Sequence, residues 1–122
     1  MTLDLVIRNG TVATASDVFR ADIGIRDGRI ALIGEGLGAA GEEIDAGGRY
    51  VLPGGIDSHV HIAQPSGDGI VMADDFESGT LSALFGGNTT ILPFCLQQKG
   101  LSLRAALADY HALAEGRCYT DV

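Results

Sequence analysis

Hydrophobic and polar residues alternate along the first third of the chain, which is typical of short β-strands with one buried face. The alternating runs cover residues 3–7, 11–14, 21–26 and 29–34. The dipeptides Asn9-Gly10 and Asp27-Gly28 separate some of these runs. Because both central residues of a type I′ turn need positive φ, we expect a tight hairpin at Asp27-Gly28 and a turn at Asn9-Gly10. The sequence therefore predicts antiparallel strands, then a glycine-rich connection with a short strand at 42–46.

From residue 50 the spacing of apolar residues changes to strands that alternate with helices. An apolar strand over 50–62 is interrupted by Pro-Gly-Gly, residues 74–87 have helical spacing, and 88–95 form a β-branched run. Ser102 is placed to cap a second helix over 103–116. An apolar stripe follows that helix at Leu103, Ala106, Leu107, Tyr110, Leu113 and Ala114. The alternation predicts a parallel α/β sheet, and the last six residues begin another strand.

Composition and charge limit the kinds of partner and the cellular compartment that we expect. The chain has 122 residues, 46% of them hydrophobic, and a formal net charge of −8. The few lysines and arginines are scattered, so we expect no nucleic acid partner. No window approaches the roughly 18 apolar residues of a membrane span, and the first ten residues do not have the pattern of a signal peptide. With Cys95 and Cys118 as reduced thiols, we expect a cytoplasmic protein.

His59 and His61 are candidate metal ligands. Side chains two apart on a strand point to the same face, so both imidazoles can reach one ion while Val60 packs on the other side. Zinc takes about four ligands, and the only other histidine, His111, lies on the second helix, so further ligands must come from elsewhere. The alternative is a chance pair on a half-exposed strand.

The same residues carry a resemblance to a known family. VLPGGIDSHVHI and ADDFESGTLSALFGGNTTILPF resemble the N-terminal part of the amidohydrolase superfamily, most closely its dihydropyrimidinase and hydantoinase (cyclic amidase) branch. DLVIRNGTV and DIGIRDGRIALIG resemble that family's small β-sandwich. The resemblance implies an α/β fold, with an N-terminal antiparallel β-sandwich segment over 1–50. The first strands and helices of a metal-dependent (β/α)8 TIM barrel would follow over 51–122, incomplete in this chain.

The resemblance also implies an activity. Relatives hydrolyse a dihydropyrimidine or hydantoin ring to an N-carbamoyl amino acid, using two divalent metal ions, usually zinc, that a carboxylated lysine bridges. His59 and His61 would then bind the more buried metal, and Asp57 would orient a ligand imidazole or serve only as a turn carboxylate. Ile70, Val71 and Met72 would border the substrate's side chain, or simply pack a loop.

Several parts of such a site are expected beyond residue 122. These are the bridging lysine, two further metal histidines and the aspartate that shuttles a proton, while Lys99 does not match the bridging position. We therefore expect no catalytic residue within this chain and no activity from it alone. The resemblance implies a homo-oligomer, a tetramer in relatives. Alternatives are an allantoinase or dihydroorotase, a non-catalytic dihydropyrimidinase-like assembly protein, and a self-contained binding module.

The remaining chemically interesting residues have simpler interpretations. Asp74 and Asp75 are expected to begin the first helix, where the helix dipole favours acids. Cys95, with no base near it in the sequence, is expected to be a buried structural thiol. His111 is expected on the solvated face of its helix, as outer helices of barrels carry no chemistry.

Overall fold

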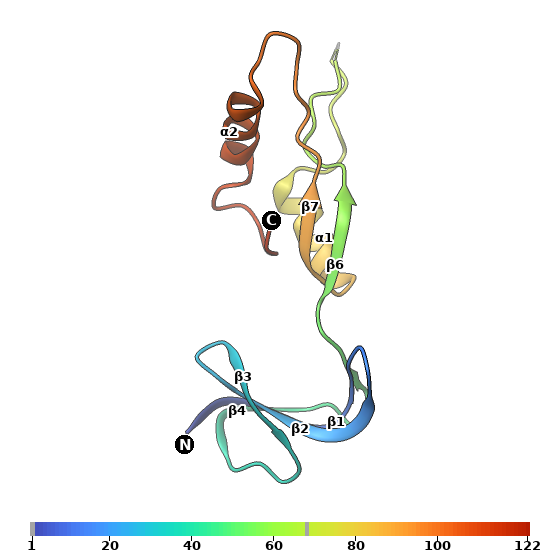
Figure 1. Ribbon diagram of the computed structural model, residues 1–122, viewed down its shortest axis with the longest axis vertical. Helices are drawn as coiled ribbons and strands as arrows, with labels where there is room; N and C mark the ends of the chain where they lie inside the picture. Colours follow the sequence, from blue (N-terminus) through green and yellow to red (C-terminus); the bar gives the residue numbers. More distant parts are fainter. Residues whose placement is uncertain (1, 68) are drawn as a thin grey trace. The chain divides into compact units, whose positions relative to one another are not determined.

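The computed structural model describes residues 2–67 and 69–122. Its contacts divide the chain into two compact units, Met1–Pro53 and Gly54–Val122. The N-terminal unit is built of strands, and the C-terminal unit contains both strands and helices (Figure 1). Each unit has its own hydrophobic core, so each is described separately.

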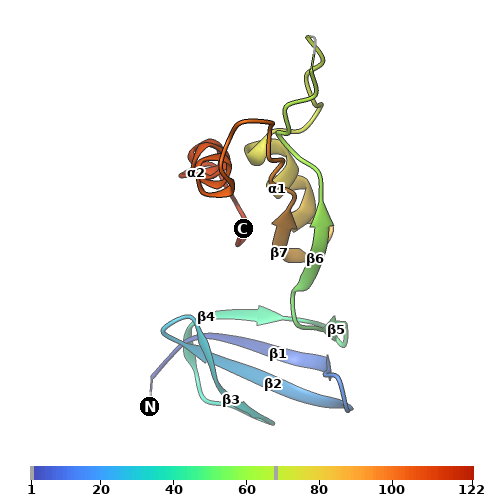
Figure 2. The ribbon, with the colours of Figure 1, turned by 45° about the horizontal axis from the view of Figure 1, so that its top comes forward.

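The N-terminal unit is one mixed sheet. Its strands are β1 (Leu3–Ala13), β2 (Val18–Arg26), β3 (Arg29–Gly34), β4 (Ala40–Asp45) and β5 (Tyr50–Val51). The order across the sheet is β3-β2-β1-β4, and β5 also pairs with β1 (Figure 2). Val12, Ala21 and Ile23 form its buried core, with Ile7, Ile25 and Val51 packed against them. The long β1 is thus the strand on which the unit is assembled.

The expectation of an antiparallel segment is correct only for part of this sheet. β1 pairs antiparallel with β2, and β2 with β3, but β4 and β5 both run parallel to β1. The connection over residues 35–39 does not fold back on β3. It carries the chain past β1 and β2 to the free edge of β1, and such a crossing delivers the next strand in the parallel direction.

The two predicted turns have different outcomes. Asp27 and Gly28 have φ values of 51° and 69° and join β2 to β3, which confirms the hairpin. Asn9-Gly10 lies inside β1, so the predicted turn there is wrong. The register with β2 shifts between Ile7 and Gly10, and Asn9 has a φ of 56°, which together describe a β-bulge. One type of bulge places a residue at positive φ, as a tight type I′ turn does, so the dipeptide alone does not distinguish them.

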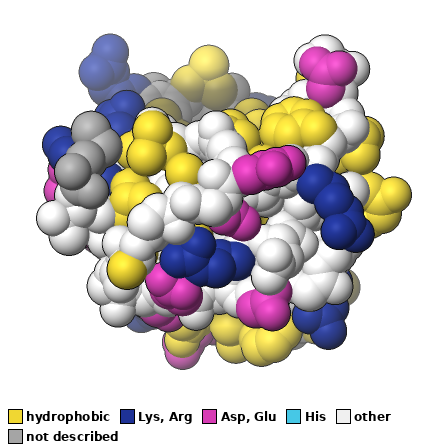
Figure 3. All heavy atoms as spheres, turned by 90° about the horizontal axis from the view of Figure 1, so that it is seen from below, with side chains coloured by type: hydrophobic (Ala, Val, Ile, Leu, Met, Phe, Trp, Pro, Cys, Tyr) yellow, Lys and Arg dark blue, Asp and Glu magenta, His cyan; other side chains and the backbone are white. Residues whose placement is uncertain are grey.

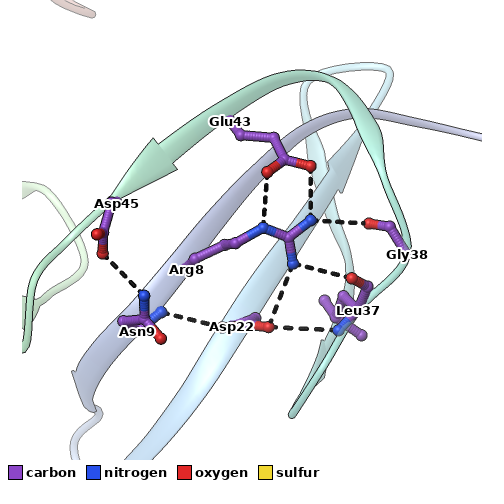
Figure 4. Close-up of polar contacts among 7 residues, drawn as sticks. All are labelled: Arg8, Asn9, Asp22, Leu37, Gly38, Glu43 and Asp45. Atoms are coloured by element: carbon purple, nitrogen blue, oxygen red, sulfur yellow. Dashed lines mark hydrogen bonds and ion pairs between the residues drawn. The ribbon is translucent and has the colours of Figure 1, made fainter.

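Arg8 links the strands of this unit (Figure 4). Its Nε and Nη2 donate to the two carboxylate oxygens of Glu43 on β4, over 2.8 and 2.6 Å. Nη1 donates to the carbonyl oxygen of Leu37 and Nη2 to that of Gly38. Nη1 also lies 3.6 Å from Asp22 Oδ2 on β2. One guanidinium therefore connects β1 and β4 and lies against β2 and the connection between β3 and β4.

Asp22 and Asn9 complete this network. Asp22 is 8% exposed and accepts hydrogen bonds from the backbone N–H groups of Asn9 and Leu37. The bond from Asn9 holds the pKa of the Asp22 carboxyl below its ordinary value of 3.8. The Asn9 side chain donates to Asp45 Oδ1 over 2.9 Å, which lowers the pKa of Asp45 as well. Arg8 is thus paired with two carboxylates, those of Asp22 and Glu43, and Asp45 is held by the Asn9 amide.

Both signs of charge occur on the surface that Figure 3 shows. Basic side chains lie among acidic and hydrophobic ones there and do not merge into a continuous basic patch (Figure 3). In the described part of the chain, no helix has the length and apolar character needed to cross a membrane.

The C-terminal unit follows the predicted order of strand, helix, strand and helix. These elements are β6 (Gly55–Val60), α1 (Phe76–Phe85), β7 (Asn88–Pro93) and α2 (Leu103–Ala114). β6 and β7 are parallel neighbours, and the core beside them contains Ile62, Phe76, Ile91 and Ala114. The strand expected over the last six residues is reduced to an isolated bridge between Thr90 and Asp121.

Both helices begin close to the predicted positions: Asp75 and Ser102 are the N-caps, and Asp74 lies before α1. The Asp75 carboxylate accepts from the backbone N–H of Ser78, whose hydroxyl accepts from the Asp75 N–H, so α1 starts with a reciprocal capping box. Ser102 Oγ accepts from the backbone N–H of Ala105 and caps α2. The stripe on α2 is only partly buried. Ala106 and Ala114 are covered, whereas its leucines are between 46% and 70% exposed.

Candidate metal centre

His59 and His61 lie next to each other at the carboxyl end of β6. His59 is in the strand and His61 follows its last residue, Val60. Their Nε2 atoms are 3.1 Å apart, and both side chains are exposed. Val60 lies against the hydrophobic core instead. The alternation of β6 therefore separates two imidazoles on the open side from an apolar residue on the packed side.

This geometry fits a shared metal ion. With zinc–nitrogen bonds of about 2.0–2.1 Å and a tetrahedral angle, two ligand nitrogens lie roughly 3.3 Å apart. The 3.1 Å between the two Nε2 atoms is close to that separation. Two imidazoles that bring the same kind of nitrogen close together are a donor set suited to zinc and other first-row divalent metals. In residues 2–67 and 69–122, no cluster of three or more His, Cys, Asp or Glu side chains is placed to hold a metal.

Phe94, directly after β7, packs against both imidazoles. Its ring centroid lies 4.4 Å from that of His59 and 5.1 Å from that of His61, and the His61 ring is stacked at an interplanar angle of 4°. The Phe94 backbone N–H donates to the carbonyl oxygen of Val60 over 2.9 Å. The parallel pairing of β6 and β7 thus brings an aromatic face to the end of the strand that holds the histidines.

Gln64 contacts the other nitrogen of the His61 ring. Gln64 Oε1 lies 2.9 Å from His61 Nδ1, and Gln64 Nε2 donates to the carbonyl oxygen of Phe94 over 2.6 Å. The chain reaches this position through a sharp bend at Ala63, which has a φ of 49°. The backbone N–H of Ala63 donates to the carbonyl oxygen of Asp74 just before α1. The bend directs Gln64 back towards the end of β7.

Tyr110 connects α2 to the same region. Its hydroxyl donates to the carbonyl oxygen of Ile62 over 2.6 Å, and its ring lies 5.0 Å from that of Phe76. Burial is the main cause that raises the pKa of Tyr110 to about 12. The phenol therefore stays protonated and remains a hydrogen-bond donor at neutral pH.

Asp57 lies on β6 two residues before His59. Its Oδ1 accepts from the backbone N–H of His59 over 3.1 Å. This bond differs from the expected one, in which the carboxylate would accept from a ligand imidazole. Asp57 thus fixes the strand backbone at His59.

Ile70, Val71 and Met72 lie on the long loop between β6 and α1. Ile70 and Val71 are 67% and 88% exposed. The three side chains line a hollow of about 460 Å³, which Gln64 also borders. Met72 Sδ accepts from the backbone N–H of Gln64 over 3.4 Å, so the loop contacts the residue beside His61.

Of the other candidates, only Asp75 has a structural role that its contacts show. Asp75 caps α1, and its bond from the Ser78 N–H lowers its pKa. His111 is exposed on α2, as expected, and Cys95 is half-buried rather than fully buried. A hollow of about 410 Å³ in the N-terminal unit is lined by Arg8 and Asp22, which form an ion pair, and also by Arg20 and Glu35.

The sequence motifs alone do not indicate that Gln64, Phe94 and Tyr110 lie at or beside this site. The sequence does contain a signal for the position of Phe94, because the residue that follows a strand parallel to β6 must lie near the end of β6. Tyr110 was placed on the apolar stripe, but its hydroxyl partner 48 positions away leaves no mark in the sequence. Gln64 was one polar residue in a loop, and only the bend at Ala63 brings it to His61.

Comparison with known proteins identifies relatives along the whole chain. The family profile described as "Urease alpha-subunit, N-terminal domain" matches residues 1–46. A D-hydantoinase from Geobacillus stearothermophilus is 52% identical over 117 residues, which are 95% of this chain and 25% of that protein. The crystal structure of a dihydropyrimidinase from Brevibacillus agri superposes with a TM-score of 0.89 at 50% identity, covering 95% of this chain and 25% of that one.

A more distant relative is an allantoinase from Escherichia coli O1:K1 / APEC. It is 38% identical over 122 residues, which are 99% of this chain and 26% of that protein. The chain therefore spans about a quarter of the length of the curated relatives it matches. In sequence and in fold, it corresponds to the N-terminal portion of the D-hydantoinase and dihydropyrimidinase branch of the amidohydrolase superfamily.

Proposed function

We propose that this chain is the N-terminal portion of a metal-dependent enzyme that opens a cyclic amide or ureide, such as a hydantoin or dihydropyrimidine ring, to an N-carbamoyl amino acid. One observation carries the proposal. The Nε2 atoms of His59 and His61 lie 3.1 Å apart at the end of a strand, in a chain that is 52% identical to a D-hydantoinase. Neither the fold nor the geometry of the two histidines specifies a substrate by itself. Together they favour metal-dependent opening of a cyclic amide.

The proposal assigns a part to each unit. Residues 1–50 belong to a small β-sandwich domain, and residues 51–122 are the first strands and helices of a (β/α)8 barrel. The parallel pair β6 and β7, each followed by a helix, supports the second assignment. In such barrels the reacting groups lie at the carboxyl ends of the strands, which is where His59 and His61 lie on β6.

His59 and His61 would hold a divalent ion, and zinc is the favoured metal. A second ion and a carboxylated lysine beyond residue 122 would complete the centre. When bound, the metal supplies hydroxide at neutral pH and polarises the ring carbonyl. The residues of this chain would bind and orient the metal: the Nε2 atoms of both histidines lie 3.1 Å apart, and Phe94 packs against their rings. Asp57 holds the backbone of His59 and so acts as a support for the ligand.

Ile70, Val71 and Met72 would contact the substituent of the substrate ring. Their hollow of about 460 Å³ borders Gln64 next to His61, so a ring held near the histidines can extend an apolar group into it. The exposure of Ile70 and Val71 supports a contact role, because neither is needed for the core. The group that transfers the proton to the leaving nitrogen is an aspartate outside this chain.

Allantoin hydrolysis is the second candidate, because the Escherichia coli allantoinase is 38% identical to this chain. The higher identity of D-hydantoinase favours the first candidate. A non-catalytic assembly protein is the third, and the retention of two histidines in metal-binding geometry disfavours it. We further propose a homo-oligomeric protein that functions in the cytoplasm.

The test uses the protein as isolated from its native source, because an intact mass several times 12.6 kDa is expected if this chain is a portion of an enzyme. The protein is assayed for ring opening of hydantoin, dihydrouracil and allantoin, before and after removal of divalent metal and after zinc is restored. The proposal predicts metal-dependent opening of hydantoin or dihydrouracil. Opening of allantoin alone would select the second candidate. If the metal-loaded protein opens none of the three rings, the proposed enzymatic function is contradicted.

A further inference from the structure

We infer that Gln64 is a positioning residue that fixes the tautomer and the ring orientation of His61, so that Nε2 presents a free lone pair to a metal ion. The inference rests on the proposed metal site. Gln64 takes no part in the chemical step. It lies on the loop after β6 and contacts both His61 and the carbonyl oxygen of Phe94, directly after β7.

The orientation of the Gln64 amide follows from its second partner. The carbonyl oxygen of Phe94 can only accept a hydrogen bond, and Gln64 has its NH2 group 2.6 Å from it. A flipped amide would place two acceptor oxygens against each other. The Gln64 carbonyl oxygen must therefore face His61 Nδ1, which lies 2.9 Å away.

The tautomer of His61 follows in turn. Gln64 Oε1 is an acceptor, so His61 Nδ1 must carry the proton. In a neutral imidazole the other nitrogen then has the free lone pair, and this is the Nε2 that lies 3.1 Å from Nε2 of His59. The stacked ring of Phe94 limits rotation of the imidazole about its own axis. The tautomer and the ring plane of His61 are thus both set before any metal binds.

His59 has a complementary role in the metal-free protein. Because Nε2 of His61 is an acceptor, the 3.1 Å contact requires Nε2 of His59 to carry a proton and donate it. To bind a metal through the same atom, His59 must carry that proton on Nδ1 instead. We therefore expect His59 to change tautomer on metal binding, while His61 keeps the one that Gln64 imposes.

Matched variants separate this role from general support of the loop. Gln64→Leu removes both hydrogen bonds. Gln64→Glu keeps an acceptor for His61 Nδ1 but loses the donor to the carbonyl oxygen of Phe94. Gln97→Leu is the control, because the Gln97 side chain also donates to a backbone carbonyl, that of Leu101, over 2.8 Å. Loss of a hydrogen-bonding partner behind a metal ligand typically lowers metal affinity by about 10–100-fold. We expect Gln64→Leu to weaken zinc binding by about 10-fold or more, and the other two variants by much less.

The second readout needs no metal. The full-length protein is prepared with ¹⁵N-labelled histidine, stripped of metal, and studied by NMR at a pH where both imidazoles are neutral. The His61 signals are assigned by comparison with a His61→Asn variant. The expected wild-type pattern is the Nδ1–H tautomer for His61, retained in Gln64→Glu and Gln97→Leu and replaced by a mixture in Gln64→Leu.

Unchanged His61 signals in Gln64→Leu, or an Nε2–H tautomer in the wild type, would overturn the inference. A protein that has the expected tautomer but binds no zinc would keep the inference about Gln64 and overturn the proposed metal site. If all variants bind zinc equally well, the proposed metal site stands and the inference about Gln64 is overturned. The two failures are therefore distinguishable.

Discussion

The hydroxyl of Tyr110 donates to the carbonyl oxygen of Ile62 over 2.6 Å, and this bond ties α2 to the residue that follows His61. Ile62 is 4% exposed, and backbone groups at such positions need a partner. The bond forms because the helix places an amphipathic side chain with its ring against Phe76 and its hydroxyl at the end of β6. The helix therefore stabilises the strand end that carries the candidate ligands.

Replacement of Tyr110 by phenylalanine tests this link. The variant keeps the ring but leaves the Ile62 carbonyl without its phenol partner, which costs about 1–3 kcal/mol of unfolding free energy. Urea denaturation of the full-length protein measures the loss. Tyr119→Phe is the control, because the Tyr119 side chain is about half exposed. Equal stability of the two variants would show that the hydroxyl contributes nothing.

The core of the C-terminal unit depends on Phe76. This residue is 1% exposed at the first position of α1, whereas Phe85 at the last position of the same helix is 88% exposed. Truncation of a buried phenylalanine to alanine leaves a cavity and costs about 3–5 kcal/mol. We expect that loss for Phe76→Ala and less than about 0.5 kcal/mol for Phe85→Ala, both by denaturant unfolding. Similar losses would mean that Phe85 is covered in the intact protein.

The Pro-Gly-Gly segment before β6 has a steric reason for its first glycine. A Cβ atom added at Gly54 would collide with the side chain of Thr89. Gly54→Ala must displace Thr89 or the strand, and overpacking of this kind costs about 1–3 kcal/mol. Gly38→Ala is the control, because nothing lies within 4 Å of a Cβ there. Thermal unfolding of both variants measures the difference, and a Gly54→Ala protein as stable as the control would contradict the collision.

Acid should weaken the N-terminal unit through Asp22. The pKa of this carboxyl is lowered in the folded state, chiefly by the hydrogen bond from the Asn9 N–H. A lowered folded pKa contributes stability that is fully present above the unfolded pKa and is lost as the pH falls through the folded one. We therefore expect stability to fall as the pH drops below the ordinary value of 3.8. The fall should be shallower in Asp22→Asn, as measured by circular dichroism, and an equally steep fall would contradict this role.

Sequence reasoning was most successful where one local signal determines the structure. Asp27-Gly28 specified its hairpin through positive φ, and Asp75 and Ser102 capped the helices that follow them. It failed where two different structures need the same local conformation. Asn9 has positive φ in a bulge rather than in a turn, and β4 is a parallel strand because its direction depends on where the preceding connection leads.

Burial was predicted less well than secondary structure. The leucines of α2 have the spacing of a buried face, but Leu103 is 70% exposed in the described part of the chain. At the candidate site the histidine pair was predictable from the two-residue period of a strand. Gln64 was not, because its contact with His61 needs the bend at Ala63 and the carbonyl of Phe94, which no local pattern encodes.

Zinc binding by His59 and His61 is measured by the metal content of the protein. The full-length protein, a His59→Gln/His61→Gln double variant and a His111→Gln control are each equilibrated with zinc, dialysed and analysed by elemental mass spectrometry. His111 is exposed on α2, so its loss should leave the metal content unchanged. If the two histidines hold the metal, the double variant loses zinc that the wild type and the control retain. Equal zinc in all three proteins would contradict it.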